Sequence, residues 1–131
     1  MASTDEGAGQ RHNRTVLVVD DEPSVVEIVA RIGRECGFDV REATSAAKAE
    51  ELATSSSMDL IIADVDMPHL RGPELIGRLR EQGHLCPVLF LSGESDLDTI
   101  DSSLSMKRAM FMPKPFTRNE LVDAIWATMK L

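Results

Sequence analysis

The sequence predicts an α/β fold, a doubly wound sheet of five parallel strands covered by five helices. Three observations support this prediction. Short apolar runs alternate along the chain with longer segments that carry apolar residues at helical spacing. The connections are short, and several runs are apolar throughout, as in strands that a parallel sheet buries on both faces. The length of 131 residues fits one domain with one core.

The expected strands are short runs of β-branched and other aliphatic residues, which favour extended structure. The first is Thr15–Val19, which is followed at once by two aspartates. The third is Leu60–Ala63, a continuous apolar run that ends in Asp64. The other three span residues 38–42, 88–91 and 109–112. Strict alternation of these strands with helices implies right-handed crossovers between parallel neighbours.

The expected helices have recognisable starts and stops. The first begins near Pro23, because proline is favoured at a first helical position where its missing N–H would have no partner, and Gly37 ends it. The other four are 46–55, 73–81, a segment around 97–104, and 117–130. The segment around 97–104 is rich in Asp, Ser and Thr, which are weak helix formers, so we expect this helix to be the mobile one.

Composition and charge narrow the class of protein. Acidic residues outnumber basic ones by 22 to 14, a net charge of −8 that repels nucleic acid and suits carboxylates gathered around a divalent cation. Residues 1–14 are polar and without apolar periodicity, so we expect a disordered tail before a domain at 15–131. Two distant cysteines and the lack of a signal-peptide or membrane-spanning stretch predict a cytoplasmic protein with no membrane partner.

Polar side chains follow four of the expected strands, at the point where each strand ends. Asp20 and Asp21 follow the first, Asp64 the third, Ser92 the fourth and Lys114 the fifth. The carboxyl ends of parallel strands meet at one edge of the sheet, which is where ligands bind in such folds. Carboxylates crowded there would repel one another, and Mg²⁺ would relieve the repulsion. The sequence therefore predicts a magnesium site at this edge.

This set of residues suits phosphoryl transfer, which demands positioning and electrostatic stabilisation from a protein. Asp64 is the candidate nucleophile, because a carboxylate can attack phosphorus and form an acyl phosphate. Asp20 and Asp21 are candidates to hold the cation. Lys114 would supply a second positive charge, and Ser92 a hydroxyl hydrogen bond to the attached phosphoryl group. Alone, each residue has a blander explanation as a cap, turn or surface residue; together they favour a site.

Several motifs in this order resemble those of bacterial response-regulator receiver domains over residues 15–130. They are Val-Val-Asp-Asp-Glu-Pro at 18–23, Asp-Leu-Ile-Ile-Ala-Asp at 59–64, Met67-Pro68 with Gly72, Leu-Ser-Gly at 91–93, and Lys-Pro-Phe at 114–116. The resemblance implies a flavodoxin-like fold of the receiver type. It also implies phosphorylation of Asp64, and a signalling switch that catalyses only its own phosphorylation and dephosphorylation.

The resemblance also implies roles for particular residues. Asp21, Asp64 and the backbone carbonyl of Asp66 would bind Mg²⁺ directly, with Asp20 at a water-mediated distance. The Lys114–Pro115 bond would be cis. Ser92 and Phe111 would act as the switch, with Ser92 moving onto the phosphoryl group and Phe111 turning inward.

Three departures from the family pattern stand out. Arg108 replaces a usual glycine, which is expected to change the turn there. Gly93 stands where alanine is common. Asp66 and Glu94 lie two residues beyond Asp64 and Ser92, positions that in this family border the path of the hydrolytic water, so we hypothesise that they modulate the lifetime of the phosphoryl group.

The implied partners are a sensor histidine kinase or a histidine phosphotransfer protein as donor, and a downstream protein as target. A homodimer through the last two helices is left open, as is the choice between a stand-alone regulator and one domain of a larger protein. The sequence names neither the kinase, the stimulus nor the target.

Two other classes fit part of the sequence. Asp64-Val65-Asp66 after an apolar strand resembles the motif of haloacid-dehalogenase-type phosphatases, although there it lies early in a longer chain and is usually followed by Thr. A receiver-like interaction module that is never phosphorylated is the second alternative, and the complete acidic set with Ser92 and Lys114 argues against it.

Overall fold

Five parallel strands form one sheet at the centre of the molecule. The computed structural model describes residues 14–93 and 106–131. The sheet order is β3-β2-β4-β5-β6, so the chain first adds β3 on one side of β2 and then builds outward on the other. The strands are β2 (Thr15–Val19), β3 (Asp39–Ala43), β4 (Leu60–Asp64), β5 (Val88–Ser92) and β6 (Ala109–Pro113). This is the predicted doubly wound arrangement.

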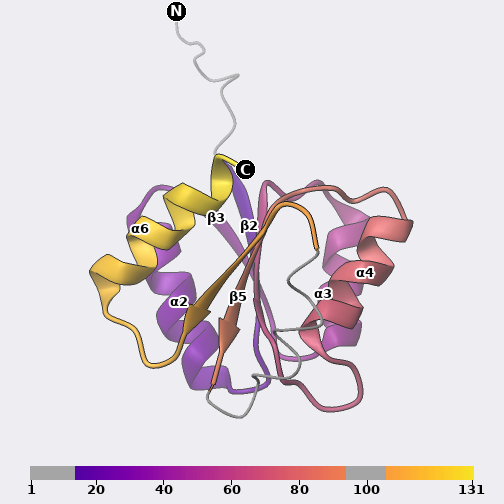
Figure 1. Cartoon of the computed structure of the whole chain (residues 1–131), viewed down its shortest axis with the longest axis horizontal. Coiled ribbons are helices and arrows are strands. Elements are labelled where there is room, and N and C mark those ends of the chain that lie inside the picture. The colour runs from indigo at the N-terminus through magenta and orange to yellow at the C-terminus, as the bar shows by residue number, and fades with distance from the viewer. Residues whose placement is uncertain (1–13, 94–105) are drawn as a thin grey trace, which may run out of the picture.

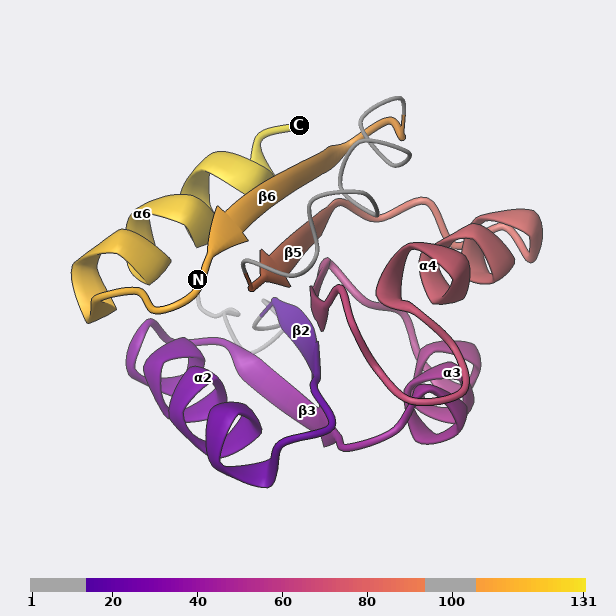
Figure 2. The ribbon, with the colours of Figure 1, turned by 60° about the horizontal axis from the view of Figure 1, so that its bottom comes forward.

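Helices cover both faces of the sheet (Figures 1 and 2). One face carries α2 (Pro23–Glu35) and α6 (Arg118–Met129), and the other carries α3 (Ala46–Ser55) and α4 (Gly72–Glu81). These are four of the five predicted helices. The fifth, around 97–104, lies outside the described residues, as does most of the predicted tail at 1–14.

The alternation of side chains along β2 explains why both faces need a cover. Val16 and Val18 pack into an aliphatic cluster with α2 and α6. Leu17 and Val19 point the other way, into a cluster with α3 and α4. All four are almost fully buried. A strand whose successive side chains point to opposite faces is buried throughout only between two helical layers.

Local sequence sets the helix starts. Pro23 occupies the beginning of α2, as predicted. The Ser45 hydroxyl accepts a hydrogen bond from the Lys48 N–H at the start of α3. Thr117 and Glu120 exchange side-chain hydrogen bonds with each other's backbone N–H at the start of α6, a capping box.

The strand boundaries differ from prediction by one residue at several ends. β3 begins at Asp39 rather than Phe38, because the Phe38 N–H donates to the Gly33 carbonyl of α2 instead of to a neighbouring strand. The Phe38 ring packs against Trp126 of α6, with ring centroids 5.1 Å apart. β4 and β5 continue through Asp64 and Ser92. Periodicity cannot predict this extension, since it depends on polar residues staying in the ladder while buried. Among the described residues, no helix is long and apolar enough to cross a membrane.

Candidate functional site

The carboxyl ends of four strands bring the predicted polar residues together at one edge of the sheet. This edge is at the bottom of Figure 1 and turns toward the viewer in Figure 2. Asp64 ends β4 and Ser92 ends β5, while Asp20 and Lys114 directly follow β2 and β6. Asp20 and Asp64 are almost fully buried, with exposed fractions of 0% and 5%.

Lys114 joins two of the carboxylates. Its Nζ lies 3.1 Å from Asp20 Oδ2 and 3.1 Å from Asp64 Oδ1. The lysine side chain is 24% exposed, so Lys114 lies at the rim of the site, on the side of β6. One ammonium shared by two buried carboxylates leaves the cluster with an excess of negative charge.

The third carboxylate, Asp21, is exposed and completes the group. Asp20, Asp21 and Asp64 each offer an oxygen within 4.8 Å of the others, the one such group of three among the residues that the structure describes. A local hydrogen bond orients the Asp20 side chain: Oδ1 accepts from the Glu22 N–H at 2.9 Å. These oxygens are close enough to share one divalent cation.

The ionisation of these groups reflects their crowding. Burial raises the pKa of Asp64 to about 6, and the Asp20 charge adds to the shift, while Lys114 and the Asp66 N–H oppose it. Burial likewise raises the pKa of Asp20. Burial opposes the charged form of Lys114, yet the two carboxylates outweigh it and raise the pKa of that ammonium. The site therefore holds its negative charge at a cost that a cation would remove.

A tight backbone crossing holds the loop after β4 in place. A Cβ atom at Gly72 would lie 2.2 Å from the carbonyl oxygen of Asp64, so no side chain fits there. The Gly72 N–H donates to the Val65 carbonyl at 2.9 Å, which closes the loop on itself. The Val65 N–H in turn donates to the Leu91 carbonyl of β5. The backbone around Asp64 is thus fixed from both sides.

The predicted switch residues lie on neighbouring strands. The Ser92 hydroxyl lies 3.4 Å from the Met112 carbonyl of β6, to which it donates. Phe111 is half-buried and stacks on Phe90, with ring centroids 5.0 Å apart and 24° between the planes. The Lys114–Pro115 bond is cis, as predicted. Arg108 has a φ of 56°, a left-handed conformation that favours the glycine usual in the family.

Asp66 sits apart from the carboxylate group. Its side chain is exposed, and Oδ1 lies 3.4 Å from Arg71 Nη1 in the same loop. Its backbone opposes the rise that burial causes in the pKa of the Asp64 carboxyl. The resemblance assigned metal binding to the Asp66 carbonyl, which stays a prediction. Sequence reasoning missed Arg71, since an arginine five residues after Asp66 carries no signal until the loop closes.

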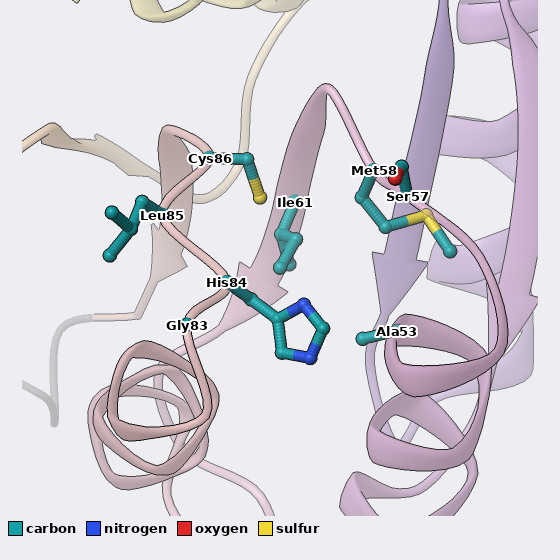
Figure 3. A pocket seen from close by; sticks show the side chains of 8 residues that line it. All are labelled: Ala53, Ser57, Met58, Ile61, Gly83, His84, Leu85 and Cys86. Atoms are coloured by element: carbon teal, nitrogen blue, oxygen red, sulfur yellow. The ribbon is translucent and has the colours of Figure 1, made fainter.

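One cavity lies away from this site. It has a volume of about 160 Å³ and opens at the opposite edge of the sheet, between the end of α3 and the loop after α4 (Figure 3). The lining residues are Ala53, Ser57, Met58, Ile61, Gly83, His84, Leu85 and Cys86. None of the predicted site residues lines this cavity. The carboxyl edge of the sheet, where the three carboxylates, Ser92 and Lys114 converge, is therefore the stronger candidate site.

The acidic cluster and Lys114 lie at the carboxyl edge of a parallel sheet, where ligands bind in such folds. Residues 16–126 match the family described as response regulator receiver domain. The chain belongs to this family, and its role is that of a phosphoacceptor in two-component signalling. Receiver domains are signalling switches.

Relatives and solved structures agree with this assignment. The response regulator protein TodT of Pseudomonas putida F1 is 30% identical over 116 residues, which cover 88% of this chain and 51% of that protein. The transcriptional regulatory protein PrrA of Mycobacterium tuberculosis is 35% identical over 115 residues, 88% and 49% of the two chains. The chain thus spans about half the length of the curated relatives it matches.

Among solved structures, chemotaxis protein CheY4 of Vibrio cholerae superposes with a TM-score of 0.82 at 26% identity, covering 89% of this chain and 99% of that one. The receiver domain of the Francisella response regulator 1452 gives 0.79 at 29% identity, with 90% and 98% covered. Both comparisons cover nearly the full length of those chains, so the match is to a complete receiver fold.

Proposed function

We propose that Asp64 accepts a phosphoryl group from a phosphohistidine of a sensor histidine kinase or a histidine phosphotransfer protein. The observation that carries the proposal is the position of Asp64 in contact with Lys114 and beside two further carboxylates. The backbone of Asp64 is also held in place, since Gly72 packs directly against its carbonyl group. The phosphorylated protein then signals by docking to a downstream protein.

Mg²⁺ is the cofactor that the donor set fits. Three carboxylates within reach of one point, with excess negative charge, form an all-oxygen site of the kind this ion prefers. Asp21 and Asp64 would hold it together with the carbonyl of Asp66, and Asp20 would act through a water. When bound, the ion neutralises the oxygens of the transferring phosphoryl group.

The chain's own residues then have distinct tasks. A carboxylate oxygen of Asp64 forms the new bond to phosphorus as the bond to the donor breaks, and the leaving group departs with its electron pair. Lys114, already 3.1 Å from Asp64, exchanges that contact for one to a phosphoryl oxygen. Ser92 leaves the Met112 carbonyl and donates its hydroxyl to another phosphoryl oxygen.

The switch follows from the same move. The Ser92 hydroxyl contacts the Met112 carbonyl next to Phe111 on β6, so its departure frees that carbonyl beside the aromatic residue. We expect the phosphorylated state to favour a changed position of Phe111 relative to Phe90. A difference of a few kcal/mol between the two states is enough for such a switch. The changed surface is what a target would recognise.

Phosphorylation by acetyl phosphate tests the proposal directly. Intact mass is recorded with and without Mg²⁺ for the wild type and for Asp64→Asn. We expect a metal-dependent gain of one phosphoryl group in the wild type and none in the variant. A folded wild-type protein that gains no phosphoryl group with Mg²⁺ present would instead favour an interaction module. Turnover of a generic phosphomonoester would favour the phosphatase alternative.

A further inference from the structure

The loop between β4 and α4 carries a charge pair beside the acceptor that the proposed function does not use. This pair joins Asp66 Oδ1 and Arg71 Nη1 at 3.4 Å. The two side chains are 55% and 50% exposed, so both lie where a donor in solution can approach. Most exposed ion pairs contribute little to stability. The Asp66–Arg71 pair, however, lies in the loop that directly follows the acceptor Asp64.

The backbone brings the two side chains together. The hydrogen bond from the Gly72 N–H to the Val65 carbonyl closes the loop, so Asp66 and Arg71 stand facing each other just inside that closure. The Arg71 N–H donates to Glu74 Oε1 at 3.0 Å, which anchors Arg71 to the first turn of α4. Arg71 is therefore held by the helix start, and Asp66 is held by Arg71.

Asp66 lies two residues after the acceptor, and its backbone opposes the rise that burial causes in the pKa of the Asp64 carboxyl. Its own carboxylate is not part of the group formed by Asp20, Asp21 and Asp64, but it belongs to the loop that directly follows Asp64. Lys114 contacts Asp20 and Asp64 from the β6 side, whereas Arg71 lies on the side of the β4–α4 loop. Lys114 thus contacts the acceptor itself, whereas Arg71 contacts Asp66.

We propose that Arg71 is a positioning residue that tethers and neutralises the Asp66 carboxylate, and so admits anionic phosphoryl donors to Asp64. Untethered, that carboxylate could turn toward the acceptor. It would then repel a donor and attract a cation. The inference rests on the proposed role of Asp64 as acceptor. In the reaction with acetyl phosphate, the Asp64 oxygen bonds to phosphorus while acetate leaves with the electron pair of the broken P–O bond.

Arg71→Gln should therefore change two quantities in opposite directions. Phosphorylation by acetyl phosphate at low ionic strength should slow about threefold to tenfold, and Mg²⁺ should bind about twofold to threefold tighter. The rate loss should shrink in high salt, and it should be smaller with phosphoramidate, which carries less negative charge. Arg71→Lys, which keeps the charge, should recover most of the rate. A purely structural role of Arg71 would not produce this opposite pair of effects.

The tether is tested by repeating Arg71→Gln in an Asp66→Asn background. In that background, Arg71→Gln should cause less than half of the rate loss that it causes in the wild type, because the carboxylate that Arg71 restrains is gone. Arg78→Gln is the control, since Arg78 lies in the same helix region and forms an ion pair of 3.0 Å with Glu50 of α3, away from the site. It should leave both quantities unchanged.

Equal losses in both backgrounds, or no loss, would overturn the proposal while the wild type still gains its phosphoryl group. Failure of the wild type to gain one would instead overturn the proposed function.

Discussion

The two ends of β4 carry the same residue type in opposite circumstances. Asp59, just before the strand, is exposed, and its Oδ2 accepts a hydrogen bond of 2.7 Å from the Thr15 N–H at the start of β2. Its own N–H donates to the Thr15 carbonyl at 2.7 Å. Asp64, at the other end, is buried and shares Lys114 with Asp20. One carboxylate fastens two strands, and the other is held in an unfavourable charge cluster.

The difference shows where the molecule gives up stability for chemistry. At the amino end of the sheet, a carboxylate facing water can satisfy a backbone N–H without a large desolvation cost. At the carboxyl end, neighbouring strands bring several acidic groups out of water together, and their mutual repulsion is only partly compensated. The following predictions test this contrast, beginning with the largest expected effect.

Gly72→Ala should be the most disruptive change, because the added Cβ would lie 2.2 Å from the Asp64 carbonyl oxygen. Backbone would have to move, and we expect a loss of about 3 kcal/mol in the free energy of unfolding. Urea denaturation measures this loss. Gly77→Ala in the same helix meets nothing within 4 Å and should stabilise the protein by up to about 1 kcal/mol. Equal changes in the free energy of unfolding for Gly72→Ala and Gly77→Ala would contradict the close contact between Gly72 and the Asp64 backbone.

Asp64→Asn should stabilise the protein in the absence of Mg²⁺. Since the pKa of Asp64 rises from 3.8 to about 6 on folding, its ionised form costs up to about 3 kcal/mol at pH 8. Removing the charge recovers part of this cost, which chemical denaturation in EDTA would detect. Adding Mg²⁺ should stabilise the wild type and leave the variant nearly unchanged. A destabilised variant in EDTA would contradict the account.

The same shift fixes the sign of a pH dependence. Between about pH 4 and 6 the folded Asp64 binds more proton than the unfolded one, so the metal-free protein should lose stability as the pH rises through this window. The loss should be complete above the folded pKa. The Asp64→Asn variant should show a flatter profile over the same window, and parallel profiles of the two proteins would rule the assignment out.

Asp59→Ala should have the smallest effect and the opposite sign to Asp64→Asn. It removes the acceptor of the Thr15 N–H, which water can then replace, so we expect a loss of about 1 kcal/mol. The same denaturation curves provide the measurement. Mg²⁺ should stabilise this variant as much as the wild type, because Asp59 lies at the far end of the strand. A gain in stability would remove the contrast between the two ends.

Much of the fold could be predicted because short apolar runs in the sequence indicate which strands are buried on both faces. Val16 to Val19 had to be covered on both sides, and the alternation of strands and helices then placed Asp20, Asp64, Ser92 and Lys114 at one edge. The pairing of Lys114 with both aspartates could not be predicted. The order of the strands places these residues at one edge of the sheet but does not give the distances between them.

Other features depended on contacts that no local pattern encodes. Phe38 packs its ring against Trp126, 88 positions later, a contact that linear order does not reveal. Arg71 faces Asp66 only because the Gly72 N–H closes the loop. The family motif marked Gly72 as a match, and the structure supplies the reason in its contact with the Asp64 backbone.

The contact between Phe38 and Trp126 makes the protein a single-site optical reporter. The chain has one tryptophan and no tyrosine, so its intrinsic fluorescence comes almost wholly from the junction of α6 with the start of β3. The emitting ring is 40% exposed, which makes it sensitive to quenchers added to the solvent. A change in emission on phosphorylation would therefore register rearrangement at this junction, without any attached dye.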